Sequence, residues 1–364
     1  MSQFQLYLAI LASGLCAAAL GLTLLSGVEP TLLLHGFLVL GALSLLRLWL
    51  HPGLWLDGAL AVLGAVAVLA SLQLYSGPPA FLWLALVATW LWSWVFVERL
   101  SDLTAPGLGQ NGGLGLLIPL TFGLAILVTW EAITRGAGVP QVILPPPSQI
   151  GTRIAASLPT LWTDFQQTFL KAVLAGYAIG CGLGFLVAIL IDRSPFLKSG
   201  LLPLGSFVSA LPIVGVAPIM VMWFGFDWQS KAAVVVIMTF FPMLVNTIAG
   251  LNAASAIERD LMRTYAASYW QTLLKLRLPA AAPFIFNALK ICSTLALIGA
   301  IVAEFFGSPV AGMGFRISAE IGRMNVDMVW AEIAMAALAG SIFYGVVALV
   351  ERGITFWHPS MRRA

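Results

Sequence analysis

The most polar stretch of this chain runs from Asp260 to Pro279, and its residue types suit contact with another macromolecule. It carries several basic residues and lies between two long apolar runs. Its apolar residues recur every three or four positions, the spacing of a helix with one apolar face, and they are Leu261, Tyr265, Tyr269, Leu273 and Leu276. Two interpretations fit, a helix lying on a lipid surface or a helix docking on a soluble partner. In both, Pro279 is expected to end the helix.

Sequence motifs for bond chemistry are missing from the chain. It has no G-x-x-x-x-G-K-[ST] loop, no H-E-x-x-H and no C-x-x-C, and its three histidines are too few for a credible Ser/His/Asp set. Cys16, Cys181 and Cys292 lie within apolar runs and are interpreted as buried side chains. We therefore expect no catalytic residue, no metal site and no cofactor on this chain, which would not be an enzyme. The net charge of +3 is too small to indicate nucleic-acid binding.

The composition predicts a membrane protein built from helices. Of 364 residues, 60% are hydrophobic and only 9% are charged, whereas soluble proteins have about 25% charged residues. Because every backbone polar group in lipid needs an internal partner, apolar runs of about twenty residues predict membrane-spanning helices. We expect an all-α polytopic fold with about ten spans, at residues 5–26, 31–50, 54–75, 79–98, 114–134, 168–191, 201–224, 231–251, 280–303 and 330–351.

Residues 99–113 divide the chain, because their glycines, proline and charges cannot span a membrane and are typical of a linker. This predicts an N-terminal bundle of four spans at residues 1–98 and a second membrane domain at residues 114–364. The polar loop of the second domain covers residues 258–279. An amphipathic surface helix is expected at residues 149–167.

Several residues inside the predicted spans could line a path through the membrane. Pro212 and Pro218 interrupt the seventh span, and Asn246 lies in the eighth. Proline frees backbone groups, and broken helices are a feature of transport paths, although simple kinking explains the prolines equally well. Three glycines spaced by four in the sixth span predict close contact with another helix; they are Gly176, Gly180 and Gly184.

Glu304 is the acidic residue that we expect near the mouth of such a path. It ends the ninth span and precedes the turn Gly312-Met313-Gly314. A second interpretation is a helix-end carboxylate paired with Arg316 or Arg323. Ion-driven carriers usually have an acidic residue near the membrane centre, and no span offers a good candidate. The chain is therefore expected to receive its energy from another protein, and an ion-coupled secondary transporter or channel is the alternative.

The distribution of Lys and Arg predicts the orientation. If the loop at residues 258–279 is cytoplasmic, the cytoplasmic side carries the excess of basic residues. An even number of spans then places both termini in the cytoplasm.

The polar loop resembles the cytoplasmic E-A-A…G…I-x-L-P loop of permease subunits of binding-protein-dependent ABC importers. The match rests on Ala267-Ser268-Tyr269-Trp270-Gln271 and Leu278-Pro279, and it looks closest to the nitrate, sulfonate, bicarbonate and taurine branch. Further motifs of this family occur in order over residues 114–358. The chain departs from the pattern at Asp260-Leu261-Met262, which stands in place of E-A-A, and at Ala266, which stands in place of the loop glycine.

The resemblance implies a six-helix type I importer permease core preceded by four extra helices, in a bacterial inner membrane. It implies a translocation path for a small solute, such as a sulfonate, a nitrate- or bicarbonate-like anion or a pyrimidine-type vitamin precursor. The implied partners are cytoplasmic ATP-binding subunits that hold ATP and magnesium, a periplasmic or lipid-anchored substrate-binding protein, and a second permease subunit that is expected to be identical to this chain. The residues implied in ATPase coupling are Asp260, Arg263, Thr264, Tyr265, Ala266, Ala267, Ser268, Trp270, Leu278 and Pro279.

Overall fold

The computed structural model describes residues 3–25, 36, 39–46, 53–74, 80–104, 114–194, 196–197, 200, 212–307 and 310–357. Within these ranges the chain consists of helices and short connections, without a β-strand. Seven helical stretches are long and apolar enough to cross a membrane: Gln3–Leu22, Leu54–Gln73, Leu114–Gly136, Leu158–Arg193, Trp228–Leu251, Tyr269–Glu304 and Val326–Ile354. The prediction of an all-α polytopic membrane protein is confirmed.

The remaining three predicted spans are described only in part or have different ends. The fourth corresponds to α4 (Ala80–Thr104), so the predicted linker begins inside this helix, and its residues 105–113 lie outside the described residues. Residues 39–46 of the second span are helical, and the rest of that span falls largely outside the described residues. The seventh span ends as α10 (Ile213–Phe224), and its residues 201–211 are outside the described ranges.

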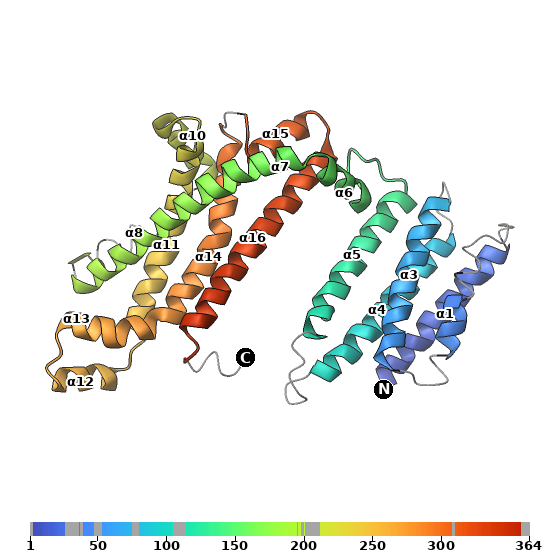
Figure 1. The fold of residues 1–364 in the computed structure, drawn as a ribbon, viewed down its shortest axis with the longest axis horizontal. Helices are drawn as coiled ribbons and strands as arrows, with labels where there is room; N and C mark the ends of the chain where they lie inside the picture. Colours follow the sequence, from blue (N-terminus) through green and yellow to red (C-terminus); the bar gives the residue numbers. More distant parts are fainter. Residues whose placement is uncertain are drawn as a thin grey trace. The chain divides into compact units, whose positions relative to one another are not determined.

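The described helices fall into two compact units, Met1–Gly151 and Thr152–Ala364. The first unit contains α1 (Gln3–Leu25), α3 (Leu54–Leu74), α4, the 3-10 turn η1 (Leu114–Leu116) and α5 (Leu117–Gly136) (Figure 1). Helix α4 contacts α1, α3 and α5. The indole of Trp90 on α4 donates to the Thr129 hydroxyl on α5 and lies edge-on to Phe122 at 5.8 Å. Because most of the linker is undescribed, the division of the chain at residues 99–113 stays a prediction.

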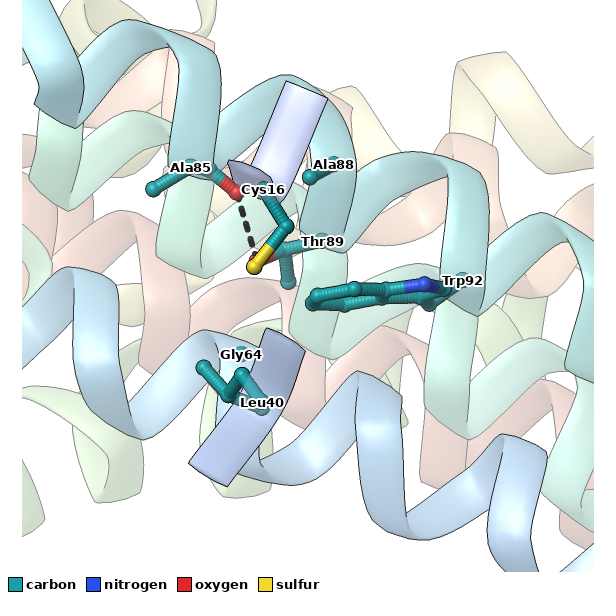
Figure 2. A pocket seen from close by; sticks show the side chains of 7 residues that line it. All are labelled: Cys16, Leu40, Gly64, Ala85, Ala88, Thr89 and Trp92. Carbon is teal, nitrogen blue, oxygen red and sulfur yellow. Dashed lines mark hydrogen bonds between the residues drawn. The ribbon is translucent and has the colours of Figure 1, made fainter. Parts of the chain in front are cut away.

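The interior of the first unit is closely packed around α4. Figure 2 shows a small pocket there, lined by Cys16, Leu40, Gly64, Ala85, Ala88, Thr89 and Trp92. The pocket leaves no room for a water-sized molecule. The Thr89 hydroxyl donates to the Ala85 carbonyl oxygen at 2.8 Å, and a Cβ at Gly64 would meet Thr89 Oγ1 at 2.6 Å. This pocket is therefore part of the packed core of the bundle.

Among its described residues, the second unit is built on the four long helical stretches from Leu158–Arg193 onward, which can be followed in Figure 1. Its elements are the end of α6 (Pro147–Ala156), α7 (Leu158–Phe165), the π-helical η2 (Gln166–Val173), α8 (Leu174–Arg193), α10, α11 (Trp228–Leu251), α12 (Ala256–Thr264), α13 (Tyr269–Thr272), the π-helical η3 (Leu273–Arg277), α14 (Leu278–Glu304), α15 (Met313–Gly322) and α16 (Val326–Ile354). Figure 1 shows α12 and α13 at one end of α11 and α14, and α10 and α15 at the opposite end.

Helices α8 and α11 approach each other backbone to backbone, as the glycine spacing predicts. A Cβ at Gly176 would meet Val235 Cβ at 2.6 Å, and a Cβ at Gly184 would meet the Phe240 carbonyl oxygen at 2.5 Å. Gly180 lies between them, against Thr239. Any side chain on this face of α8 would push the two helices apart.

The predicted surface helix at residues 149–167 is wrong in its ends and its continuity. It is two helices, α6 and α7, which are interrupted at Ser157. Pro159 lies in the first turn of α7, where its missing N–H costs nothing, but it could not continue α6. Helix α7 then runs without a break through η2 into α8, so only the second part of the predicted surface helix forms one helical run with the sixth span.

The three cysteines are free and buried, as predicted. Cys16 lies in the first unit, Cys181 in α8 and Cys292 in α14. Cys181 and Cys292 pack in one apolar cluster with Met243 and Ala288. These thiols therefore fill space between helices.

Candidate functional site

The α12–α13 segment begins with a helix cap that makes α12 a defined helix. The Ser255 hydroxyl accepts from the Glu258 N–H at 3.3 Å, and the Glu258 carboxylate accepts from the Ser255 N–H at 2.8 Å. This reciprocal pair satisfies two backbone donors at the start of the helix. The Ser255 N–H also holds the pKa of the Glu258 carboxyl below its usual value. The predicted loop boundary at residue 258 therefore lies inside the first turn of α12.

The end of α12 has the geometry that a glycine usually provides. Ala266 has a φ of +50°, in the left-handed region. The Ala266 N–H donates to the Arg263 carbonyl oxygen at 2.8 Å, and the Ala267 N–H donates to the Met262 carbonyl oxygen at 3.0 Å. These two bonds form a Schellman helix end, in which the left-handed position favours glycine. The geometry gives a physical reason for a glycine at the place where this chain has Ala266.

The expected single helix over this stretch is wrong, because the chain turns at residues 265–268 and starts again at α13. The Ser268 hydroxyl accepts from the Gln271 N–H, and the Gln271 side-chain oxygen accepts from the Ser268 N–H at 2.8 Å. Pro279 does not end a helix either. It lies in the first turn of α14, directly after π-helical η3, where a missing N–H is tolerated.

One face of α12 is apolar and exposed. Ile257, Leu261 and Tyr265 are 83%, 56% and 78% exposed and are spaced by four residues, so they form one ridge. No residue of α12 is buried. Asp260 and Arg263 form an exposed ion pair of 3.3 Å on the same helix. Such a helix presents an apolar ridge with a charged border to its surroundings.

The residues predicted for coupling occupy two different places. Asp260, Arg263 and Thr264 lie on α12, and Tyr265 through Ser268 form the turn. The side chain of Trp270 on α13 is about half exposed. Leu278 and Pro279, in contrast, are partly buried at the start of α14. Ile257 was missed, although its spacing of four from Leu261 and Tyr265 could have found it.

The π-helical η3 (Leu273–Arg277), which follows α13, is fixed to three helices by apolar contacts and by one ion pair. Leu273 is buried with Leu251 and Ala281. The Arg277 guanidinium contacts both carboxylate oxygens of Asp192, at 2.6 and 2.7 Å. Asp192 was not predicted as a functional residue, and only its position at the end of the sixth span could have marked it.

At the opposite end of α14, Glu304 holds the glycine turn that precedes α15. Its carboxylate accepts from the Thr168 hydroxyl at 2.8 Å and from the Gly314 N–H at 2.7 Å. The Thr168 hydroxyl in turn accepts from the Met313 N–H at 2.8 Å. Gly312 has a φ of +134°, and a Cβ there would meet the Glu304 carboxylate at 2.6 Å. Glu304 therefore fixes this turn against η2.

The expected pairing of Glu304 with Arg316 or Arg323 is wrong. Arg316 pairs with the fully buried Asp164 at 2.8 Å, which raises the pKa of the guanidinium, and Arg323 pairs with Glu320 at 2.9 Å. Asp164 also accepts from the Gly312 N–H at 2.6 Å. Buried carboxylates of α7 and α14 thus bind the two sides of one turn. The role of Glu304 in a translocation path stays a prediction.

The other residues predicted for the path keep local partners. Pro212 is the residue before α10, and Pro218 lies within that helix. The Asn246 side chain donates to the Pro242 carbonyl oxygen at 2.8 Å, within α11. Their role in a path also stays a prediction. In the part of the chain that the structure describes, no three His, Cys, Asp or Glu side chains are grouped as a metal site would need.

Comparison with known proteins identifies the family. Residues 180–356, from within α8 to beyond α16, match the family described as binding-protein-dependent transport system inner membrane component. A formylaminopyrimidine transport permease protein of Halalkalibacterium halodurans is 31% identical over 241 residues, which are 66% of this chain and 96% of that protein. A riboflavin transport system permease protein of Chloroflexus aurantiacus is 30% identical, over 72% of this chain and 95% of its own. A taurine transport system permease protein of Escherichia coli is 26% identical, over 67% of this chain and 92% of its own. Together with the helical membrane fold, these matches confirm the family resemblance, and the chain belongs to the permease subunits of binding-protein-dependent ABC importers.

Proposed function

We propose that this permease binds a cytoplasmic ATP-binding subunit through α12 and α13, which we call the docking segment (residues 256–272). The observation that carries this proposal is the exposed ridge of Ile257, Leu261 and Tyr265. A helix that binds in the groove of another protein uses apolar residues about one turn apart, with charges at the border. Asp260 and Arg263 are placed to supply that border.

The orientation follows from charge. The docking segment and the following η3 carry Arg259, Arg263, Lys275 and Arg277. Because cytoplasmic loops of membrane proteins are enriched in Lys and Arg, we place this end of the second unit in the cytoplasm. We place both termini on the same side, and the turn held by Glu304 on the outer side of the inner membrane.

The energy and the substrate would both come from partners. ATP and magnesium would be held by the ATP-binding subunit, and a periplasmic or lipid-anchored binding protein would deliver the solute. Two copies of the permease would enclose the path, with Pro212, Pro218 and Asn246 as candidate lining residues. The relatives are named for solutes as different as formylaminopyrimidine and taurine. We therefore propose a small solute, either a sulfonate or similar anion or a pyrimidine-type vitamin precursor, that is selected mainly by the binding protein.

The test is the recovery of the ATP-binding subunit with variants of the ridge. Leu261→Asp should leave membrane insertion unchanged and strongly reduce co-purification of the ATP-binding subunit, because it places a charge in an apolar contact. Val310→Asp is the matched control, since Val310 is also exposed, at the opposite end of the unit. Equal recovery of the ATP-binding subunit with both variants would refute the docking assignment.

A further inference from the structure

Arg277 is the last residue of η3, which follows the docking segment, and it connects η3 to the ends of two membrane helices. Its two terminal nitrogens contact the carboxylate oxygens of Asp192, the second-last residue of α8, at 2.6 and 2.7 Å. Its Nε donates to the carbonyl oxygen of Leu251, the last residue of α11, at 2.9 Å. A planar guanidinium that binds both carboxylate oxygens fixes orientation as well as distance. The start of α14 is therefore tied to α8 and α11 by one side chain.

The same carboxylate is contacted by the docking segment itself. The hydroxyl of Tyr269, the first residue of α13, donates to Asp192 at 3.0 Å. The guanidinium of Arg193 lies 5.7 Å from the centre of the Tyr269 ring and 5.9 Å from that of Trp270. Asp192 and Arg277 are only 9% and 12% exposed, so solvent screens their attraction weakly. Helix α13 is thus bound to the C-terminal end of α8 through several contacts.

These contacts differ from the rest of the segment. The side-chain hydrogen bonds of α12 stay local: Asp260 bonds to Arg263 and Thr264, and Glu258 bonds to Ser255, the residue that caps the helix. Among the described residues, the side-chain hydrogen bonds that lead from residues 256–277 into another helix end on Asp192 or on the Leu251 carbonyl oxygen. Polar connection between the segment and the membrane helices is therefore concentrated at Asp192 and Arg277.

We propose that Asp192 and Arg277 are positioning residues that pass movement of the docking segment to α8 when the ATP-binding subunit binds ATP. The proposal rests on the docking of the segment on that subunit. We expect movement of α8 to shift α11 as well, because Gly176 and Gly184 bring the two backbones into contact. The pair would thereby connect ATP binding to the helices of the membrane domain.

Hydrogen exchange of the full permease in complex with its ATP-binding subunit tests this proposal. Exchange is compared with and without magnesium ATP plus vanadate, at residues 256–272 and at residues 186–194, which are the end of α8 and its C-cap Ser194. In the wild type, both regions should change their exchange on ATP binding. In Asp192→Asn, the change at residues 256–272 should remain and the change at residues 186–194 should be lost. Arg277→Lys keeps the charge for folding but loses the two-pronged contact, and it should give the same loss.

The matched control is Glu351→Gln, which breaks the ion pair of Lys290 and Glu351 between α14 and α16. This pair is 20% and 12% exposed and does not touch the docking segment. The control should lower thermal stability as Asp192→Asn does, yet keep the response of α8. An α8 response that persists in Asp192→Asn, or that is lost equally in Glu351→Gln, would overturn the proposal. If hydrogen exchange at residues 256–272 of the wild-type complex does not change on ATP binding, the docking assignment itself is refuted.

Discussion

Replacing Ala266 by glycine should stabilise the turn between α12 and α13, and the expected gain can be worked from its backbone geometry. An L-residue in the left-handed region costs about 1–2 kcal/mol relative to glycine. Ala266 has a φ of +50° and is exposed, so glycine would remove this strain without losing buried contacts. Glycine also makes the unfolded chain more flexible, which offsets about 0.4–1 kcal/mol. The net expectation is a local stabilisation of about 0.5–1 kcal/mol.

The assay is hydrogen exchange at the two amides that close the turn. The N–H groups of Ala266 and Ala267 donate to the carbonyl oxygens of Arg263 and Met262, so their protection reports opening of this helix end. A stabilisation of this size should raise protection about two- to fivefold, if the segment opens locally.

Ala267→Gly is the control, because Ala267 does not have a positive φ and glycine there should lower protection. Protection that falls in Ala266→Gly, or that rises equally in both variants, would refute the strain argument.

Two further predictions concern the opposite end of the second unit. Thr168→Val should lower the thermal unfolding temperature, because it leaves the buried Met313 N–H without its acceptor, at a cost of about 1–3 kcal/mol. It also removes one of the two donors to the Glu304 carboxylate, which keeps the Gly314 N–H. The exposed Thr163→Val is the control, and an equal effect of both variants would contradict this account. The pKa of Asp227 lies below its usual value because Gln167 donates to its carboxylate, so the ionised form stabilises the folded chain at neutral pH and this contribution is lost as the pH falls below about 4. The stability difference between wild type and Asp227→Asn should therefore shrink on acidification, and a difference that grows would show the sign to be wrong.

Hydropathy located most of the membrane helices, because lipid imposes long apolar runs. The eighth span was predicted at residues 231–251, and α11 begins three residues earlier, at Trp228, where the Asp227 carboxylate caps the helix. The ends were less accurate because helices continue beyond their apolar runs: α4 extends to Thr104 and α16 to Ile354. Apolarity marks the part of a helix that lies in lipid, and caps mark its ends.

The docking segment was recognised by its polarity, but the periodicity of its apolar residues did not reveal its internal break. The spacing of Tyr265, Tyr269 and Leu273 continues across the turn, so periodicity alone predicts one helix. Two Ser-x-x-Glu/Gln patterns, at Ser255 and Ser268, indicate two separate helix N-termini, those of α12 and α13. The π-helical geometry of η2 and η3 has no comparable signal in the residue pattern.

Contacts between distant residues could not be predicted from the sequence. Asp192 and Arg277 are 85 positions apart, and Thr168 and Glu304 are 136 positions apart. Periodicity assigns a residue to a face of its own helix, but it does not say which helix lies opposite. These pairs depend on the packing of α8, α11 and α14, which is a property of the folded chain.

The burial of all three cysteines makes the natural chain suitable for site-specific labelling. Cys16, Cys181 and Cys292 are 1%, 5% and 0% exposed, so a water-soluble maleimide should find none of them in the folded protein. Removing them would be harmful, since Cys181 and Cys292 fill the space between α8, α11 and α14. A single new cysteine at an exposed position outside the apolar ridge, such as Thr264, would therefore be the only reactive thiol, and fluorescent or spin probes there could follow the docking segment.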